Sequence, residues 1–313
     1  MAGVTTPHAW VSSPDMADII LVTGGQGQVG QELSRFQWPE DVDVRLPGRD
    51  ALDLTDRDGI EHYVAQLAPA AIVNCAAYTA VDRAEDEPDV AWAVNARGVG
   101  WLARAARLAD IPMVHVSTDY VFSAVYCDLR SEDYPVGPAG VYGASKLAGE
   151  IAAAAGCDRL VIVRTAWVVS PFRTNFVKTM LRLAADRDEL GVVVDQRGCP
   201  TGAGDIADAL ATIVLRMIAD PAAPTGIYNF VNAGEASWAE LAEAVMDEAE
   251  RHGMKRARIK PIPTSDFPTR AVRPADSRLD IRRIAEDYDI SPRHWRAMIT
   301  STVAELADFQ RQG

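Results

Sequence analysis

The stretch Asp18-Ile-Ile-Leu-Val-Thr-Gly-Gly-Gln-Gly-Gln-Val-Gly30 decides the fold of this chain. Its apolar first half has the length and composition of a strand buried on both faces. Its second half spaces Gly24, Gly27 and Gly30 three residues apart, and a helix is expected to follow over residues 31–36. Residues without a Cβ allow a tight turn and let backbone N–H groups approach a pyrophosphate at a helix N-terminus. The pattern favours dinucleotide binding, with a purely structural glycine turn as the alternative.

The same alternation of strands and helices continues downstream. Strands are expected over residues 42–46, 71–74, 111–116 and 159–165, and helices from near Thr55, over 90–108 and over 142–155. This order predicts an α/β fold, a doubly wound parallel Rossmann sheet over residues 18–170. Later strands at 192–195 and 227–231 and helices at 205–219 and 238–251 alternate less regularly. They predict a smaller C-terminal α/β substrate-binding lobe over 171–313, with 201–231 returning to the first domain.

Composition and charge exclude several classes of function. The chain has 313 residues and a net charge of −13 without a Lys/Arg cluster, which argues against nucleic-acid binding. No apolar run reaches the roughly 18 residues that a membrane helix needs. The four cysteines are scattered and fit a reducing cytoplasm better than a zinc site or a disulfide scaffold. Residues 1–17 are polar and predict a mobile tail, or a segment upstream of an alternative start at Met16.

Tyr142 and Lys146 form the pattern Y-x-x-x-K at the start of a predicted helix. Four-residue spacing places both side chains on one helical face, where an ammonium favours the phenolate and lowers a tyrosine pKa that is normally near 10. Such a tyrosine can exchange a proton with a carbonyl or alcohol oxygen. Seen alone, the pair is more often an ordinary surface pair. Thr118, at the end of the fourth strand, can hydrogen-bond the same substrate oxygen or be a satisfied strand-end hydroxyl, whereas His115 is expected in the core.

The end of the second strand bears on the choice of cofactor. Pro47-Gly48-Arg49 stands where an NAD-preferring site usually has a carboxylate. Arg49 can meet a 2′-phosphate or be a solvated loop charge. Asp53 and Leu54 are expected beside the adenine. These residues predict that NADPH is used at least as well as NADH.

Longer motifs give the chain a family resemblance. In order, they are G-G-Q-G-Q-V-G (24–30), N-C-A-A-Y-T-A-V-D-R-A-E (74–85), S-T-D-Y-V-F (117–122), Y-G-A-S-K-L-A-G-E (142–150), R-T-A-W (164–167), N-F-V-K-T-M-L-R-L (175–183), D-Q-R-G-C-P-T (195–201) and R-P-A-D-S-R-L (273–279). Over residues 18–306 the chain resembles the dTDP-4-dehydrorhamnose reductases, a family of extended short-chain dehydrogenase/reductases. The glycine turn and Y-x-x-x-K indicate only the superfamily, and the other motifs point to this family.

The resemblance implies an NADPH- or NADH-dependent reduction of the C4 ketone of dTDP-4-dehydro-L-rhamnose to dTDP-L-rhamnose. It implies a catalytic set of Thr118, Tyr142 and Lys146. Together with the residues described above, the resemblance gives a set of expected cofactor contacts. They are Gly24, Gly27, Gln28, Val29, Gly30, Arg49, Asp53, Leu54, Ala76, Ala77, Tyr78, Tyr142 and Lys146. The expected substrate contacts are Thr118, Asp119 and Trp167, with Arg273 on the pyrophosphate and Asn175 nearby.

Two departures from the family pattern bear on specificity and assembly. Residues 123–130 replace the family's usual Asp-Gly continuation after Phe122, which bears on the sugar accepted. Gly204 stands where some members carry an acidic ligand of a metal-linked dimer, so no such bridge is expected, and the chain is predicted to be a monomer or a homodimer.

Other activities remain open from the sequence. They are a related nucleotide-sugar 4-ketoreductase, an epimerase of the same superfamily and a non-catalytic cofactor-binding relative. A dehydratase is disfavoured because Tyr120, and not a second carboxylate, follows Asp119.

Overall fold

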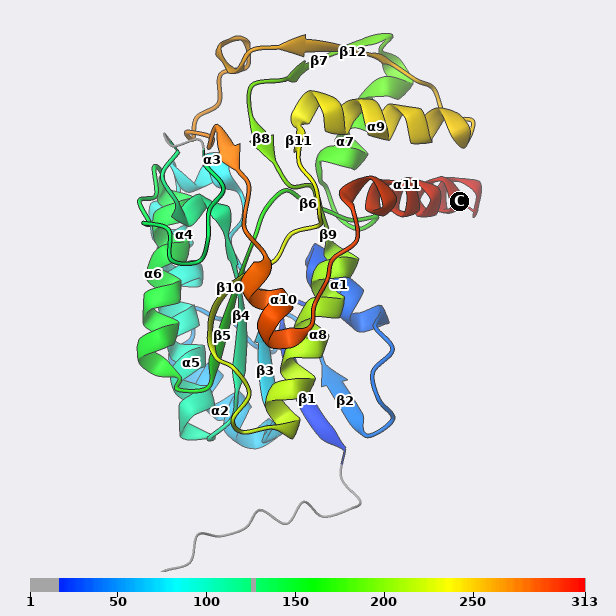
Figure 1. Cartoon of the computed structure of the whole chain (residues 1–313). Coiled ribbons are helices and arrows are strands. Elements are labelled where there is room, and N and C mark those ends of the chain that lie inside the picture. The colour runs from blue at the N-terminus through cyan, green and yellow to red at the C-terminus, as the bar shows by residue number, and fades with distance from the viewer. Residues whose placement is uncertain (1–16, 125–127, 313) are drawn as a thin grey trace, which may run out of the picture.

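A six-stranded parallel sheet forms the centre of the computed structural model, which describes residues 17–124 and 128–312 (Figure 1). The strand order is β10-β5-β4-β3-β1-β2, and every pairing is parallel. The strands are β1 (Asp18–Thr23), β2 (Val42–Arg45), β3 (Ala71–Asn74), β4 (Met113–Thr118), β5 (Leu160–Thr165) and β10 (Gly226–Asn229). The predicted doubly wound parallel sheet is confirmed. Of the predicted tail at residues 1–17, only Ala17 lies within the described residues.

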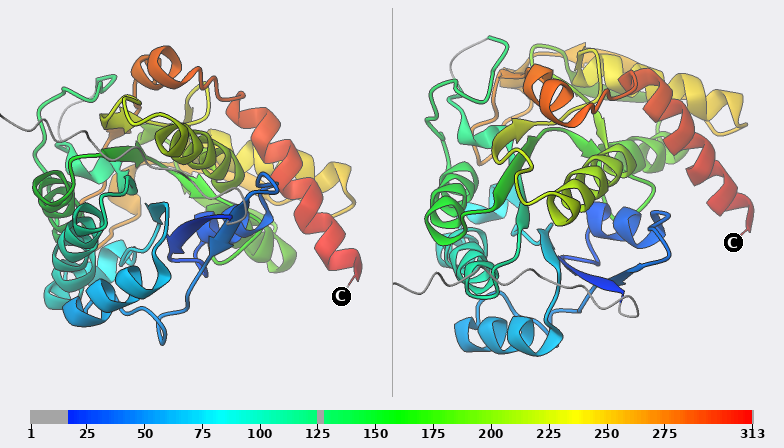
Figure 2. Two further views of the ribbon diagram at one scale, coloured as in Figure 1. Left: turned by 90° about the horizontal axis from the view of Figure 1, so that it is seen from below. Right: turned by 60° about the horizontal axis from the view of Figure 1, so that its bottom comes forward.

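Helices cover both faces of this sheet, as the two views of Figure 2 show. One face carries α2 (Arg57–Leu67), α5 (Val99–Leu108) and α6 (Val141–Gly156), and the other carries α1 (Gln28–Arg35), α8 (Ala203–Ala219) and α10 (Arg282–Tyr288). Strand residues alternate between the two cores: Val114 packs toward α8, whereas Met113 packs toward α5. His115 and Ser117 therefore face α6.

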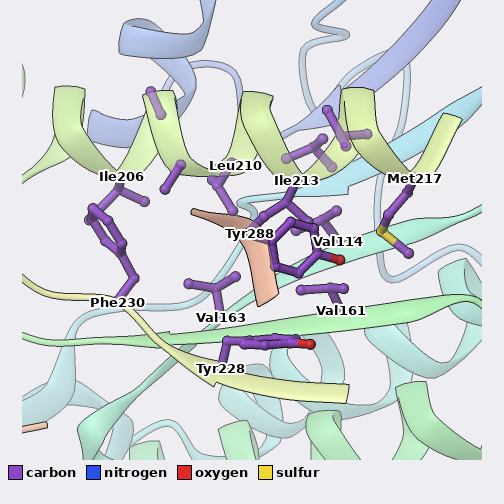
Figure 3. Close-up of a cluster of buried hydrophobic side chains, with 14 of the residues drawn as sticks. Val114, Val161, Val163, Ile206, Leu210, Ile213, Met217, Tyr228, Phe230 and Tyr288 are labelled. Carbon is purple, nitrogen blue, oxygen red and sulfur yellow. The ribbon is translucent and has the colours of Figure 1, made fainter. Parts of the chain in front are cut away.

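The spacing of apolar residues in α8 explains why this segment forms a helix against the sheet. Ile206, Leu210, Ile213 and Met217 recur at spacings of three and four, which places them in one apolar stripe. Figure 3 shows this stripe packed over alternate residues of the sheet, with Tyr288 of α10 beside them. Because α8 is buried along this stripe, the chain after residue 201 lies against the central sheet and continues into β10.

A second lobe sits beyond the carboxyl ends of the central strands (Figure 1). Its helices α7 (Phe176–Asp186), α9 (Trp238–Arg251) and α11 (Trp295–Gln312) share an apolar core with β7 (Glu189–Val193), which pairs with β12 (Arg258–Ile262). Short strands join the lobes: β6 (Val168–Val169), β8 (Arg197–Gly198), β9 (Thr201–Gly202), β11 (Ala236–Ser237) and β13 (Asp276–Ser277). No helix in the described ranges has the length and apolarity needed to cross a membrane.

Several predicted boundaries were wrong in detail. α1 begins at Gln28 and not at Gln31, and α2 is capped by Asp56, whose carboxylate accepts the Gly59 N–H, and not by Thr55. The expected 192–195 strand is β7 at 189–193. The single helix expected over 90–108 is α4 (Pro88–Trp92), a π-helical turn η1 (Ala93–Gly98) and α5. Shorter helical turns complete the chain: α3 (Val81–Ala84), η2 (Asp119–Val121) and η3 (Thr264–Asp266).

Candidate active site

The glycine turn between β1 and α1 is closed too tightly for side chains. Gly24 has φ +74, and a Cβ there would stand 2.6 Å from the backbone nitrogen of Ala76. A Cβ on Gly30 would stand 2.3 Å from the carbonyl oxygen of Gly24. These two positions therefore require glycine, and the turn and the N-terminus of α1 line a cavity in which backbone N–H groups can meet an anion.

One cavity of about 1530 Å³ runs from this turn to the second lobe. It lies at the carboxyl ends of β1, β3 and β4, where open α/β sheets bind ligands. All of the site residues named from the sequence line it: Gly24, Gly27, Gln28, Val29, Gly30, Arg49, Asp53, Leu54, Ala76, Ala77, Tyr78, Thr118, Asp119, Tyr142, Lys146, Trp167, Asn175 and Arg273. Sequence reasoning missed Tyr120, Arg173, Phe176 and Trp238, which line it too.

Tyr142 lies in the first turn of α6 against the end of β4. The Thr118 hydroxyl, which donates to Asp119 at 3.1 Å, lies close enough to the phenol to affect its pKa, and the ring of Tyr120 meets that of Tyr142 edge-on with centroids 5.4 Å apart. Gly143 permits this approach, since a Cβ there would stand 2.2 Å from the carbonyl oxygen of Tyr120. Burial raises the pKa of Tyr142, and the nearby Thr118 hydroxyl opposes this only in part. The lowered pKa expected from the sequence was therefore wrong, because desolvation dominates.

Lys146 is buried one helical turn further on. Its Nζ donates to the carbonyl oxygen of Val116 at 2.7 Å and lies 3.4 Å from Nε2 of His115. Burial lowers the pKa of Lys146 to about 8, while Glu150 and Cys75 act in the opposite direction. This lysine can therefore change its charge near neutral pH.

A buried ion pair fixes α6 against the sheet. Glu150 accepts from Arg164 at 3.0 and 2.7 Å and from the Ser117 hydroxyl at 2.5 Å, and both charged side chains are at most 3% exposed. Because Ser117 is on β4 and Arg164 on β5, these contacts hold the helix that carries Tyr142 and Lys146 in register with the sheet.

Asn95 fixes the segment that follows β3. The π-helical turn directs its side chain inward, where its amide oxygen accepts the Tyr78 N–H at 2.8 Å and its amide nitrogen donates to the Tyr78 carbonyl and the Ser145 hydroxyl. The tyrosine hydroxyl donates to Glu87 at 2.6 Å. Asn95 therefore fixes the backbone of Tyr78 and Glu87 fixes its hydroxyl, so the cavity wall formed by residues 76–78 is anchored at Tyr78.

At the far end of the glycine turn, Arg49 is 76% exposed and pairs with Asp53 at 3.3 Å. Asp53 also accepts the backbone N–H and the hydroxyl of Thr55, and the backbone bond is the largest cause that lowers its pKa. This exposed pair costs little to open, because surface ion pairs contribute at most about 1 kcal/mol.

Three aromatic rings form one side of the cavity in the second lobe, here called the aromatic wall: Trp167, Trp238 and Phe176. The two indoles stack with centroids 3.5 Å apart and planes at 10°, and Phe176 lies 4.7 Å from Trp238. Trp167 has φ +50 in the left-handed region, and the Trp238 indole N–H is held by Gln196. Gly198 lies directly beneath, since a Cβ there would stand 2.4 Å from the Trp167 ring.

Polar groups occupy the remaining sides. Arg273 donates to the Tyr120 hydroxyl at 3.0 Å and pairs with Asp82 of α3. Asn175 caps α7 and donates to the Gln28 side chain at 2.9 Å. Arg273, the expected pyrophosphate contact, and Asn175, expected nearby, are therefore held by different elements.

Asp119 lines the catalytic end of the cavity, and Arg130 at the end of the changed loop is buried. Burial raises the pKa of Asp119 to about 6, with hydrogen bonds from Ser277 and Thr118 opposing it. Arg130 is fully buried and donates to the carbonyl oxygens of Asp276 and Ser123. Residues 125–127 of this loop are outside the described part, within which no three His, Cys, Asp or Glu side chains are grouped to hold a metal ion.

Comparison with known proteins was made on both sequence and structure. The family model "RmlD substrate binding domain" matches residues 18–308. Curated dTDP-4-dehydrorhamnose reductases are similar over most of their length: that of Sinorhizobium fredii is 42% identical over 88% of this chain and 93% of its own, and that of Salmonella typhimurium 38% identical over 92% and 97%.

Solved structures agree with these sequence matches. The dTDP-4-dehydrorhamnose reductase of Bacillus anthracis in complex with NADP is 32% identical with a TM-score of 0.85, covering 93% of this chain and 100% of that one. The orthologue from Clostridium acetobutylicum has a TM-score of 0.86 at 32% identity, covering 92% and 99%. On these matches, the chain belongs to the dTDP-4-dehydrorhamnose reductase family.

Proposed function

We propose that this protein reduces the C4 ketone of dTDP-4-dehydro-L-rhamnose to dTDP-L-rhamnose, with NADPH or NADH as the reductant. The observation that carries the proposal is the arrangement of Thr118, Tyr142 and Lys146 along the same cavity as an open glycine turn. Family membership supplies the substrate class.

The glycine turn fits a dinucleotide. Its backbone leaves no room for Cβ atoms at Gly24 and Gly30, and the N-terminus of α1 faces the cavity. Gly27, Gln28 and Val29 would hold the pyrophosphate, Asp53 and Leu54 the adenine side, and residues 76–78 the nicotinamide side. When bound, the reduced cofactor supplies a hydride to a carbonyl carbon.

Tyr142 acts as the acid in this proposal. A phenol is protonated at neutral pH, so Tyr142 holds the proton that the nascent alkoxide needs. Thr118 donates a hydrogen bond to the same oxygen, a contact that strengthens as negative charge develops. In its ammonium form Lys146 binds ribose hydroxyls and favours charge on the tyrosine oxygen.

The opposite end of the cavity would bind the dTDP portion. Trp167 presents a flat apolar surface held by Trp238, and Arg273 presents a guanidinium that suits phosphate oxygens. Arg273 is already oriented by Tyr120 and Asp82, so binding an anion there exchanges one carboxylate partner for the substrate. Asn175 and Asp119 complete the proposed substrate contacts.

The direct test is to incubate the protein with NADPH and dTDP-4-dehydro-L-rhamnose and to follow absorbance at the NADPH band and the sugar product. Loss of NADPH with equimolar formation of dTDP-L-rhamnose is the expected result. Conversion of the sugar without net NADPH loss would indicate an epimerase. No conversion of this or a related 4-keto sugar, with cofactor still bound, would indicate a non-catalytic relative.

Cofactor choice, assembly and location are part of the proposal. The Leu46-Pro47-Gly48-Arg49 segment after β2 carries no carboxylate, and Arg49 can release Asp53 to meet a 2′-phosphate, so NADPH serves at least as well as NADH. The protein acts in the cytoplasm as a monomer or a homodimer, without nucleic-acid or membrane partners.

A further inference from the structure

His115 is a fully buried titratable residue that the proposed chemistry does not use. It lies on β4 in a polar row that crosses three neighbouring strands at matched register. Thr23 on β1 is the register partner of Asn74 on β3, and Asn74 is the partner of His115. The Thr23 hydroxyl donates to the Asn74 amide oxygen at 2.6 Å, and the Asn74 amide nitrogen lies 3.0 Å from Nδ1 of His115.

This row determines the tautomer of the histidine. The Asn74 amide oxygen also accepts the backbone N–H of Ala76 at 3.1 Å, so the amide group is oriented with its NH₂ toward His115. His115 Nδ1 must then accept, and a neutral imidazole carries its proton on Nε2. Burial and the nearby Lys146 both lower the pKa of His115, so the ring is neutral.

The Nε2–H consequently points at Lys146. Nζ lies 3.4 Å away and already donates to the carbonyl oxygen of Val116. An ammonium has three donors and no acceptor, whereas a neutral amine has a lone pair that can accept the Nε2–H. The contact is therefore favourable only when Lys146 has lost its proton.

We propose that His115 is a positioning residue that donates its Nε2–H to the neutral amine of Lys146 and so sets the protonation state of this lysine. The other groups that face Lys146 are Glu150 and Tyr142 on α6 and Cys75 after β3. Glu150 favours the ammonium but is itself held by Arg164, and the Cys75 thiol stays protonated because burial raises its pKa to about 12. His115 favours the neutral amine and so acts against Glu150.

The catalytic consequence rests on the proposed function. After Tyr142 has given its proton to the alkoxide, its phenolate must be reprotonated before the next turnover. A Lys146 ammonium that releases its proton easily is a suitable donor in that step, and the amine that remains is stabilised by His115 until a proton is taken up from solvent. The step moves one proton and needs no further reactant.

A matched pair of variants tests the contact. In His115→Gln the amide nitrogen stands near the place of Nε2 and keeps a donor toward Lys146. In His115→Asn the amide group stands near the place of Nδ1, so that the contact with Asn74 is kept and the donor to Lys146 is lost. The lysines of this chain are Lys146, Lys178, Lys255 and Lys260, so ε-carbon-13 lysine NMR can follow each one through a pH titration.

The Lys146 signal is assigned by its absence in Lys146→Met. Loss of one hydrogen bond is expected to raise the Lys146 pKa by about half a unit to one unit in His115→Asn and to leave it near the parental value in His115→Gln. An unchanged or lowered pKa in His115→Asn overturns the proposal. Should that variant not fold, Asn74→Asp serves instead: the carboxylate would accept a hydrogen bond from Nδ1–H, so that Nε2 carries no proton and becomes an acceptor and the Lys146 pKa rises, and an unchanged pKa would overturn the proposal equally.

A kinetic measurement separates this proposal from the proposed function. In a plot of kcat against pH, the high-pH limb should shift to higher pH in His115→Asn, together with the Lys146 pKa that NMR measures. If the parent protein reduces no 4-keto sugar while the NMR shift is present, the proposed function fails and the contact between His115 and Lys146 stands. If ketone reduction is observed and the NMR shift is absent, the proposed function stands and the contact between His115 and Lys146 fails.

Discussion

Gly198→Ala should damage the aromatic wall without touching the catalytic residues. The added Cβ would stand 2.4 Å from Cε2 and 2.7 Å from Nε1 of Trp167. Ordinary contact between carbon atoms needs about 3.5 Å, so the indole must retreat by about 1 Å. Trp238 restricts that movement, because its ring is stacked on the Trp167 indole with centroids 3.5 Å apart. Overpacking of this kind costs about 1–3 kcal/mol.

Gly191→Ala is the matched control. It lies on β7 in the same lobe, and its added Cβ would meet Ile262 at 3.4 and 3.5 Å, an ordinary contact. Both substitutions reduce the freedom of the unfolded chain by a similar amount, so the difference between them isolates the clash.

Urea unfolding and steady-state kinetics with the dTDP-sugar measure the two effects. We expect Gly198→Ala to be less stable than Gly191→Ala by about 1–3 kcal/mol and to raise KM more than it lowers kcat, since the wall lies away from the reacting carbon. Equal stability and equal KM in the two variants would refute both the clash and the assignment of the wall to substrate binding.

The remaining predictions concern catalysis, binding and stability. Tyr142→Phe should lower turnover by about 10²–10⁴-fold while the cofactor Kd stays unchanged, and near-parental turnover would show that another group is the acid. Arg273→Ala should raise KM for the dTDP-sugar more than it lowers kcat, and a pure kcat effect counts against a remote phosphate contact. Arg49→Ala should lower the ratio of kcat/KM for NADPH to that for NADH, and an unchanged ratio would make Arg49 a solvated loop charge. Arg164→Met should cost about 3–5 kcal/mol of unfolding free energy because it leaves the buried Glu150 carboxylate unpaired, and adding Glu150→Gln should recover part of that loss.

The fold class could be predicted because its signals are local. The buried strand, the glycine spacing and the following helix lie within one continuous stretch, and each is dictated by sterics and by the burial of neighbouring residues. The family motifs likewise identified the dTDP-4-dehydrorhamnose reductases without coordinates. Boundaries were less well predicted: α2 takes its cap from Asp56 and not Thr55, a choice between adjacent polar residues that local propensity does not resolve.

The sequence by itself therefore determined the sheet, the family and many, though not all, of the residues that line the cavity. Only the tertiary structure decided how those residues behave. The pKa of Tyr142 rises because β4 and η2 bury the phenol, an effect that the spacing to Lys146 cannot reveal. Trp238 joins the site because its ring stacks on Trp167, far away in the chain. His115 reaches Lys146 because three strands and α6 bring its two nitrogens between an amide and an amine, and such contacts depend on packing between elements that no local pattern encodes.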